Sequence, residues 1–168
     1  YPIVGGMVHR GSSLDAVSGL NSYTNMRSEI EYLVENPDVK SILLEIDSGG
    51  GFFAGAFDFR DFILSLRDKK PVYAISQISL GSAAYLVGSA CEKLYVTQTG
   101  SVGSIGVVAM HTDQSEKNRE LGVKPTFVYA GAYKTAGNPH EPLEGKSLEY
   151  MQESVNDSYE MFVSKVAE

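Results

Sequence analysis

Apolar residues recur along the chain in two patterns, one typical of strands and the other typical of helices. Short apolar runs rich in branched side chains, bounded by glycine, proline or polar residues, predict buried strands. These runs cover residues 3–8, 39–46, 71–75, 93–96, 105–108 and 125–129. Strands are therefore expected at intervals along most of the chain.

Between these runs, apolar residues return every three or four positions over residues 21–35 and 53–66, which predicts helices, and a further helix is expected over 113–121. Small residues predict a further, closely packed helix over 81–90. A last helical segment carries an apolar stripe that suits core packing or a subunit contact equally well. This stripe consists of Leu148, Met151, Val155, Tyr159, Phe162, Val163 and Val166. Strands that alternate with helices predict an α/β fold with a largely parallel sheet and ligands at the strand carboxyl ends.

The size of the chain sets the expected domain organisation. With 168 residues, 43% of them apolar, residues 1–168 are expected to form a single domain around one core. The chain begins at Tyr1 without a methionine and ends at Glu168 inside a helical pattern, so we expect a fragment of a longer protein. A membrane anchor or targeting signal would lie outside this segment, and the sequence assigns no cellular location.

Charge and cysteine content narrow the choice of partners. The net charge is −7, from 14 basic and 21 acidic residues. The sequence contains no run of basic residues that could follow a phosphate backbone, so nucleic acid is not an expected partner. The single cysteine, Cys91, excludes an intrachain disulfide and is expected to be buried. Neither a metal-ligand cluster nor a nucleotide-binding motif is visible, so no cofactor is predicted.

Three glycine-rich segments follow predicted strands, at the edge where an α/β fold places its site. They are residues 47–51, 80–85 and 100–106. Glycine lets backbone N–H groups approach a ligand closely, and an oxyanion requires such donors to be fixed in place. The segments therefore predict a site for an anionic intermediate.

Ser82 lies where a predicted strand gives way to a helix, between small residues that leave room for a substrate. This is a position for a nucleophile, although a serine before a helix is also a common N-cap. The three histidines, His9, His111 and His140, have no local pattern that ties them to Ser82. A Ser-His-Asp triad stays open, because triad partners meet in space rather than in sequence.

Residues 39–143 resemble the signal peptide peptidase A family of serine/lysine peptidases, which includes the head-assembly proteases of tailed phages. Five blocks in the family's order carry the resemblance. They are Asp47-Ser48-Gly49-Gly50-Gly51, Lys70-Pro71-Val72, Ser82-Ala83-Ala84-Tyr85, Gly103-Ser104-Ile105-Gly106-Val107, and Gly131-Ala132-Tyr133-Lys134 with Gly137-Asn138-Pro139.

The resemblance implies a crotonase-like fold of repeated β-β-α units, shared with Clp-type peptidases and enoyl-CoA hydratases. It also implies a serine endopeptidase that acts on peptides or unfolded proteins with a Ser/Lys dyad. Ser82 matches the nucleophile, Lys134 the general base and Ser104 the serine that orients the lysine. The Gly50 and Ala83 amides would line the oxyanion hole.

One departure from the family pattern bears on the substrate. Cellular members have two glycines after the nucleophile, whereas this chain has Ala83 and Ala84, which is closer to the phage branch and its capsid-maturation proteases. The small residues around Ser82 favour small or apolar substrate side chains beside the scissile bond. The resemblance also implies a ring-like homo-oligomer with sites near subunit interfaces, and leaves open whether one site takes its serine and lysine from two subunits.

The general base places a demand on the surroundings of Lys134. A solvated lysine is protonated near neutral pH and is a base only where burial favours the neutral amine. No acidic residue lies within six positions of Lys134, and its neighbours include Tyr129 and Tyr133.

Two alternatives to the peptidase remain, namely a crotonase-type acyl-CoA enzyme and a non-catalytic capsid or scaffold protein.

Overall fold

The computed structural model describes residues 1–11 and 18–168. The chain divides into two compact units, the first made of Tyr1–Gly106 and Phe162–Glu168 and the second of Val107–Met161. Each unit has its own set of contacts and is described separately below. The expected single domain stays a prediction.

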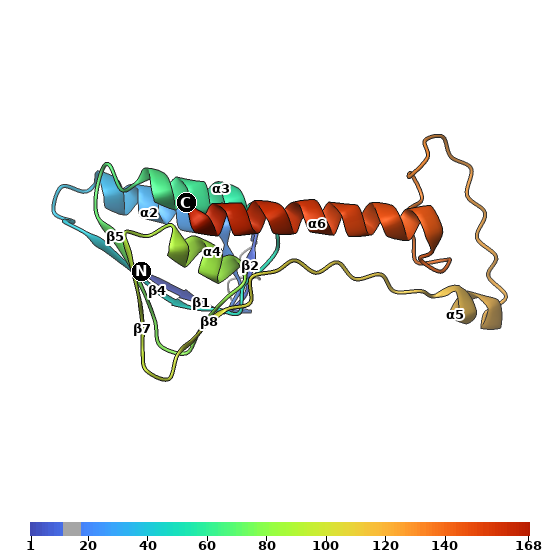
Figure 1. Cartoon of the computed structure of the whole chain (residues 1–168), viewed down its shortest axis with the longest axis horizontal. Coiled ribbons are helices and arrows are strands. Elements are labelled where there is room, and N and C mark those ends of the chain that lie inside the picture. Colours follow the sequence, from blue (N-terminus) through green and yellow to red (C-terminus); the bar gives the residue numbers. More distant parts are fainter. Residues whose placement is uncertain (12–17) are drawn as a thin grey trace. The chain divides into compact units, whose positions relative to one another are not determined.

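A parallel four-stranded sheet forms the centre of the first unit (Figure 1). Its strands, in spatial order, are β1 (Pro2–Val4), β4 (Ile42–Asp47), β5 (Val72–Ser76) and β7 (Lys93–Val96). Every neighbouring pair is parallel. The predicted α/β fold with a parallel sheet is confirmed.

Side chains alternate between the two faces of β4. Ile42, Leu44 and Ile46 are buried, whereas Leu43, between two of them, is 50% exposed. Successive side chains in a strand point to opposite faces. The apolar run therefore directs one face of the sheet toward the core.

Two short parallel pairs of strands accompany the sheet. They are β2 (Met7–Val8) with β3 (Asn21–Ser22), and β6 (Ser79–Gly81) with β8 (Ser101–Gly103). The sequence pattern did not predict β6, which has only three residues. Together β5, β6 and the helix that follows them form one β-β-α unit of the kind that the resemblance implies.

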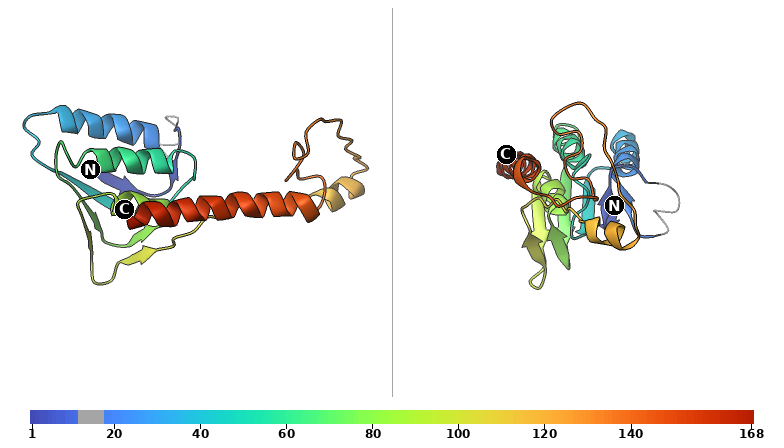
Figure 2. Two further views of the ribbon diagram at one scale, coloured as in Figure 1. Left: turned by 45° about the horizontal axis from the view of Figure 1, so that its top comes forward. Right: turned by 90° about the vertical axis from the view of Figure 1, so that its right-hand side faces the viewer.

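Three helices cover the sheet of the first unit. They are α2 (Tyr23–Glu35), α3 (Ala56–Ser65) and α4 (Ala83–Ser89), and Figure 2 shows α2 and α3 side by side. Tyr23 and Phe59 pack against each other across α2 and α3, with ring centroids 5.6 Å apart. The predicted helices 21–35, 53–66 and 81–90 are thus present with shorter bounds.

Arg60 of α3 binds the end of α6 (Gly145–Ala167), the part of that helix that belongs to the first unit. Its side chain is 1% exposed, and it donates to Glu168 Oε2 at 2.8 Å and to the Lys165 carbonyl at 2.6 Å. Phe162 packs edge-on against Phe57 beside this contact. A buried guanidinium needs such partners, so this contact holds the two helices together.

The second unit contains α5 (Ser115–Glu120) and most of α6. Strands were predicted over 105–108 and 125–129, but neither segment is a strand, and both predictions are wrong. Val108 is 90% exposed and Val128 is 97% exposed. A strand forms only against a partner, and the described part of the chain offers these segments none.

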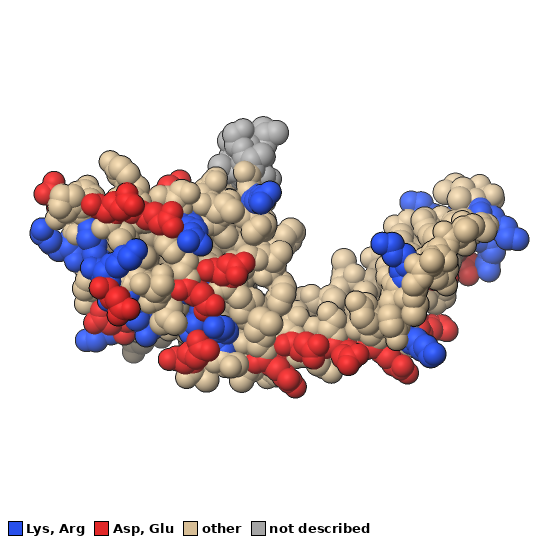
Figure 3. Space-filling model, turned by 90° about the horizontal axis from the view of Figure 1, so that it is seen from above, with Lys and Arg blue, Asp and Glu red and all other residues tan. Residues whose placement is uncertain are grey.

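Acidic side chains gather along α6 (Figure 3). Glu149, Glu153, Asp157 and Glu160 follow one another at helical spacing and share one side of the helix. A negative face of this kind repels a phosphate backbone. Within residues 1–11 and 18–168, none of the helices combines the length and apolar character needed to cross a bilayer.

Candidate active site

The three glycine-rich segments meet in the first unit. Ser48 and β6 are joined by two backbone hydrogen bonds, from Ser48 N–H to the Ser79 carbonyl at 2.8 Å and from Gly81 N–H to the Ser48 carbonyl at 2.9 Å. Ser82 N–H donates to the Gly103 carbonyl at 2.8 Å. Segments that are far apart in the sequence therefore lie around one serine.

The backbone of Ser82 has an unusual conformation. Ser82 has φ 50° and ψ −125° and occupies the turn between β6 and α4. A non-glycine residue held at positive φ costs about 1–3 kcal/mol, and such strain is concentrated at functional sites. A serine on a strained turn from strand to helix is the geometry of a nucleophile elbow, which exposes the hydroxyl.

The N-cap interpretation of Ser82 does not fit this geometry. An N-cap serine has extended backbone, and its side chain accepts a hydrogen bond from the first turn. Ser82 has neither property, since its side chain makes no cap hydrogen bond. Ser22, which begins α2, has both, with φ −89° and a hydrogen bond from Asn25 N–H. Ser82 is half-buried, and its hydroxyl bonds to none of the described residues.

The Ala83 amide lies next to the nucleophile. Ala83 is the first residue of α4 and is 6% exposed. The first amides of a helix have no intrahelical acceptor. The N–H group of Ala83 is therefore free to donate to an oxygen beside Ser82.

Gly50 lies directly against Ser82. A Cβ atom at Gly50 would be 2.7 Å from Ser82 Cβ and 3.1 Å from Ala83 N, and Gly50 has φ +113°. Only glycine fits between these atoms in this conformation. The Gly50 N–H, however, donates to Ser48 Oγ at 3.1 Å. The Gly51 N–H has no acceptor among the described residues, but the atoms nearest to a Cβ at Gly51 belong to Met7 and not to Ser82.

Ser104 directly follows Gly103, whose carbonyl accepts the hydrogen bond from Ser82 N–H. Gly103 has φ +124° and Ser104 has φ 53°, so two successive residues have positive φ. The Ser104 side chain is exposed, and its hydroxyl bonds to nothing within residues 1–11 and 18–168. The structure therefore brings Ser104 into the same cluster as Ser82, Gly50 and Ala83.

Lys134 belongs to the second unit. Its loop begins at Gly131, whose carbonyl accepts from Lys134 N–H at 3.2 Å, and Tyr133 stacks on Tyr150 of α6 with centroids 4.6 Å apart. The Lys134 side chain is exposed, and its amine has no partner among the described residues. The second unit by itself therefore does not give Lys134 the dry surroundings that a neutral amine needs.

The histidines bond to other groups. His111 Nε2 lies 2.8 Å from the Asn138 carbonyl, and His140 Nδ1 lies 2.9 Å from Asn118 Nδ2. Both contacts join the loop after Lys134 to its neighbours in the second unit. None of the three histidines is hydrogen-bonded to Ser82, so the structure gives a Ser-His-Asp triad no support.

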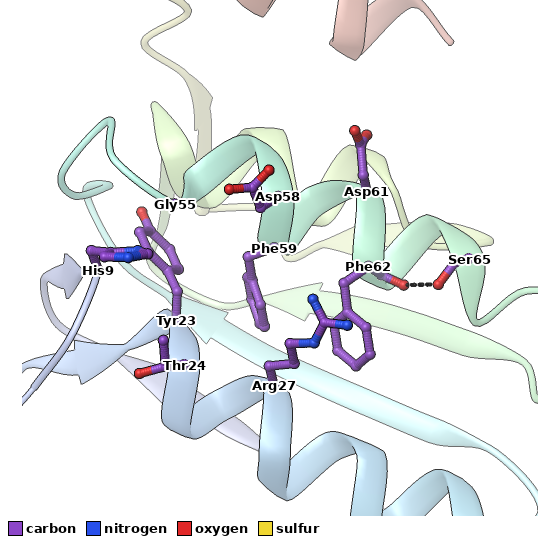
Figure 4. Close-up of a pocket in the computed structure, with 10 residues that line it drawn as sticks. All are labelled: His9, Tyr23, Thr24, Arg27, Gly55, Asp58, Phe59, Asp61, Phe62 and Ser65. Carbon is purple, nitrogen blue, oxygen red and sulfur yellow. Dashed lines mark hydrogen bonds between the residues drawn. The ribbon is translucent and has the colours of Figure 1, made fainter.

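His9 lines a separate pocket of about 500 Å³ in the first unit. The pocket lies between α2 and α3 (Figure 4). Its walls are His9, Tyr23, Thr24, Arg27, Gly55, Asp58, Phe59, Asp61, Phe62 and Ser65. None of the predicted site residues contributes to it, so this pocket is distinct from the cluster around Ser82.

Cys91 is not an alternative nucleophile. The thiol is 4% exposed, and burial raises its pKa to about 12, although the nearby Arg67 acts in the opposite direction. Only the thiolate is a strong nucleophile, so a thiol with this pKa is unreactive near neutral pH.

Residues 65–168, which include Ser82, Ser104 and Lys134, match the model of peptidase family S49. The chain is 39% identical over 166 residues to head-tail preconnector protein GP5 of Enterobacteria phage P21, covering 99% of this chain and 33% of that protein. It is 36% identical over 166 residues to capsid assembly protease C of Escherichia phage lambda, covering 99% and 38%. Identity to the chloroplastic serine protease SPPA of Arabidopsis thaliana is 25% over 170 residues, covering 96% and 25%.

The chain thus spans between 33% and 38% of the length of the two phage relatives. The matched region carries the predicted nucleophile and the predicted base in one continuous stretch. On this evidence of matched length and residues, the chain belongs to peptidase family S49.

Proposed function

We propose that the chain is the catalytic core of a serine endopeptidase whose nucleophile is Ser82. The observation that carries this proposal is the strained backbone of Ser82, with φ 50° and no cap hydrogen bond. A fold keeps such strain only where surrounding contacts enforce it, as at an active site. The unpaired Ala83 amide beside the serine supplies one donor for an oxyanion.

The chemistry follows from these groups and Lys134. Ser82 Oγ attacks the peptide carbonyl carbon while its proton passes to the neutral Lys134 amine. The resulting oxyanion accepts hydrogen bonds from Ala83 N–H and from an amide of the glycine loop. The intermediate then expels the amine leaving group, which takes the proton from Lys134. Water, deprotonated by the same lysine, hydrolyses the acyl-enzyme and releases Ser82.

The second oxyanion donor belongs to the glycine loop. The family resemblance assigns this role to Gly50. Its N–H already donates to Ser48 Oγ, so Gly50 would have to exchange that bond for the oxyanion. Gly50 is nevertheless the residue of the loop that lies against Ser82 Cβ and Ala83 N, so its N–H is the donor we favour. Ser104 is proposed to orient the Lys134 amine.

Lys134 acquires its dry surroundings, in this proposal, by packing against a surface outside the second unit. Mixing variants of Ser82 and Lys134 tests whether a neighbouring copy in a homo-oligomer supplies that surface. The exposure of Lys134 within its own unit supports this requirement. An amine packed against an apolar surface loses solvation of its charged form and becomes a base near neutral pH.

The substrate is proposed to be a peptide or unfolded segment of a phage capsid protein. Identity to the two phage relatives is 39% and 36%, against 25% to the chloroplast protease. One of these phage proteins is a capsid assembly protease by name. The residues Ala83 and Ala84 after the nucleophile favour the same branch.

Covalent labelling by a fluorophosphonate tests the proposal. We expect an adduct on Ser82, located by mass spectrometry, whose rate of formation rises between pH 6 and 10 as the base loses its proton. Lys134→Ala should lose this labelling, and Ser82→Ala serves as the control for adduct position. An unlabelled Ser82, or labelling independent of Lys134, would instead favour an acyl-CoA enzyme or a non-catalytic scaffold protein.

A further inference from the structure

Asp47 is the last residue of β4, and one oxygen of its side chain accepts four hydrogen bonds. Asp47 Oδ1 lies 2.7 Å from Ile78 N, 3.0 Å from Gln77 N, 3.3 Å from Ser79 N and 3.0 Å from Ser76 Oγ. Three of the four donors are consecutive backbone amides. A single carboxylate oxygen therefore fixes the whole connection 76–79 between β5 and β6.

The connection 76–79 leads both to Ser82 and to the Gly103–Ser104 turn. It continues through β6 into Ser82. The Gln77 carbonyl accepts from Thr97 Oγ1 at 2.8 Å, and the Ile78 carbonyl accepts from Ser101 N–H at 3.1 Å. These two bonds fix Thr97 and the first residue of β8 in place. Gly103, the last residue of β8, accepts the hydrogen bond from Ser82 N–H. The connection is thus the common support of Ser82 and of the Gly103–Ser104 turn.

The main chain of Asp47 continues into the glycine loop. The next residue, Ser48, pairs with Leu80 of β6 as an isolated parallel bridge. Two residues further on, Gly50 lies against Ser82 with no room for a methyl group. The side chain of Asp47 therefore holds the nucleophile strand, while its own backbone leads to the glycine loop.

From this geometry we propose that Asp47 is a positioning residue that sets the spacing between Ser82 and the glycine loop 49–51. The inference rests on the proposed function, because it assigns Asp47 to the support of that same site. Asp47 does not donate or accept a proton in the reaction. It fixes the distance between the nucleophile and the oxyanion donors before substrate binds, and oxyanion stabilisation depends on donors held in advance.

The donors around Asp47 are suited to a permanent anion. No lysine, arginine or histidine within residues 1–11 and 18–168 forms an ion pair with it, so neutral N–H and O–H groups hold the charge. Burial alone would raise the pKa of the Asp47 carboxyl, but the hydrogen bonds from Ile78, Ser76, Ser79 and Gln77 outweigh it and hold the pKa below its ordinary value. Hydrogen bonds to an ionised acceptor are stronger than those to a neutral one.

The test compares Asp47→Ala with Asp47→Asn in the full-length protein, using fluorophosphonate as the probe. Asn keeps a side-chain oxygen at the same place, so Asp47→Asn should recover part of the Ser82 labelling rate that Asp47→Ala loses. We expect Asp47→Ala to lower the maximal rate of Ser82 phosphonylation by about 10-fold or more, with half-saturation changed less than about 3-fold. Glu45→Ala is the matched control, because Glu45 accepts from the Gln77 side chain at 2.6 Å without contacting the amides that bind Asp47.

Amide hydrogen exchange over residues 76–82 gives a readout that does not depend on catalysis. Faster exchange there in Asp47→Ala, partly reversed in Asp47→Asn and absent in Glu45→Ala, would support the inference. Unchanged exchange, or a folded Asp47→Ala protein with the wild-type rate, would overturn it. If Asp47→Ala does not fold, Asp47→Asn decides, because its neutral oxygen accepts weaker hydrogen bonds than a carboxylate and should still loosen residues 76–82. Exchange and labelling both at the wild-type rate in that variant would contradict the inference. Absence of labelling in the wild type would refute the proposed function, while the exchange result would still decide the structural role of Asp47.

Discussion

At the scale of single residues, the candidate site is defined by backbone conformations that side chains rarely adopt. Ser82 and Ser104 are the non-glycine residues at positive φ within the described ranges. Both belong to the blocks that carry the family resemblance. The sequence located Ser82 through the change from strand to helix, but no residue pattern reports that its backbone is strained.

The strain at Ser82 predicts a trade-off between stability and activity. Ser82→Gly and Ser82→Ala should both abolish phosphonate labelling, because both lack the hydroxyl. Ser82→Gly should nevertheless be the more stable of the two by about 1 kcal/mol, since glycine tolerates φ 50° and alanine does not. Urea unfolding of the two variants measures the difference. Equal stabilities would show that Ser82 is not strained in solution.

Gly50 and Gly49 form a matched pair for the glycine loop. A methyl group at Gly50 would collide with Ser82 Cβ at 2.7 Å, whereas a methyl group at Gly49 meets no atom within 4 Å. Gly50→Ala should therefore reduce the labelling rate by about 100-fold, comparable to the loss of an oxyanion donor, and Gly49→Ala by less than about 3-fold. Similar rates for the two variants would place the glycine loop outside the site.

At the scale of elements, the sequence predicted the helices and strands that bury an apolar face. It missed the short strands that are recognised only by their hydrogen bonds to a neighbouring strand. The helices over 21–35 and 53–66 and the strands over 39–46 and 71–75 were found because their apolar spacing is regular. Strand β6 was missed because three residues carry no period. The hydrogen bonds of Asp47 were missed because its four donors lie about 30 residues away along the chain.

The contact between α3 and the end of α6 predicts that two arginine-to-alanine substitutions lower the free energy of unfolding by very different amounts. Arg60→Ala should lower the free energy of unfolding by about 3 kcal/mol, because it removes a buried side chain together with its charged hydrogen bonds to the Lys165 carbonyl and Glu168. Arg119→Ala should cost less than about 1 kcal/mol, since its ion pair with Glu116 is solvent-exposed. Chemical denaturation of both variants tests this, and equal losses would contradict the structural role of Arg60.

At the scale of the whole molecule, the wrong strand predictions fall on segments whose structure depends on contacts with other parts of a protein. The apolar segments 105–108 and 125–129 resemble strands, yet they have no pairing partner in the described chain. Met110 is 86% exposed beside the first of them, and Val128 is 97% exposed in the second. Unpaired backbone with exposed apolar side chains is typical of an edge that binds another chain. The same reasoning applies to Lys134, which is exposed in its unit although its proposed role requires burial.

Assembly of the site from two copies therefore gives the last prediction. Ser82→Ala lacks the proposed nucleophile and Lys134→Ala lacks the proposed base, so neither protein should hydrolyse substrate alone. If neighbouring copies share sites, mixing the two should restore labelling on Ser82 of the Lys134→Ala protein, because the lysine comes from the other subunit. The rate should fall on dilution, since a shared site exists only in the oligomer. Mixing Lys134→Ala with the double variant Ser82→Ala/Lys134→Ala is the control and should restore nothing. A mixture that stays inactive, together with a wild-type rate independent of dilution, would instead mean that neighbouring copies do not share sites.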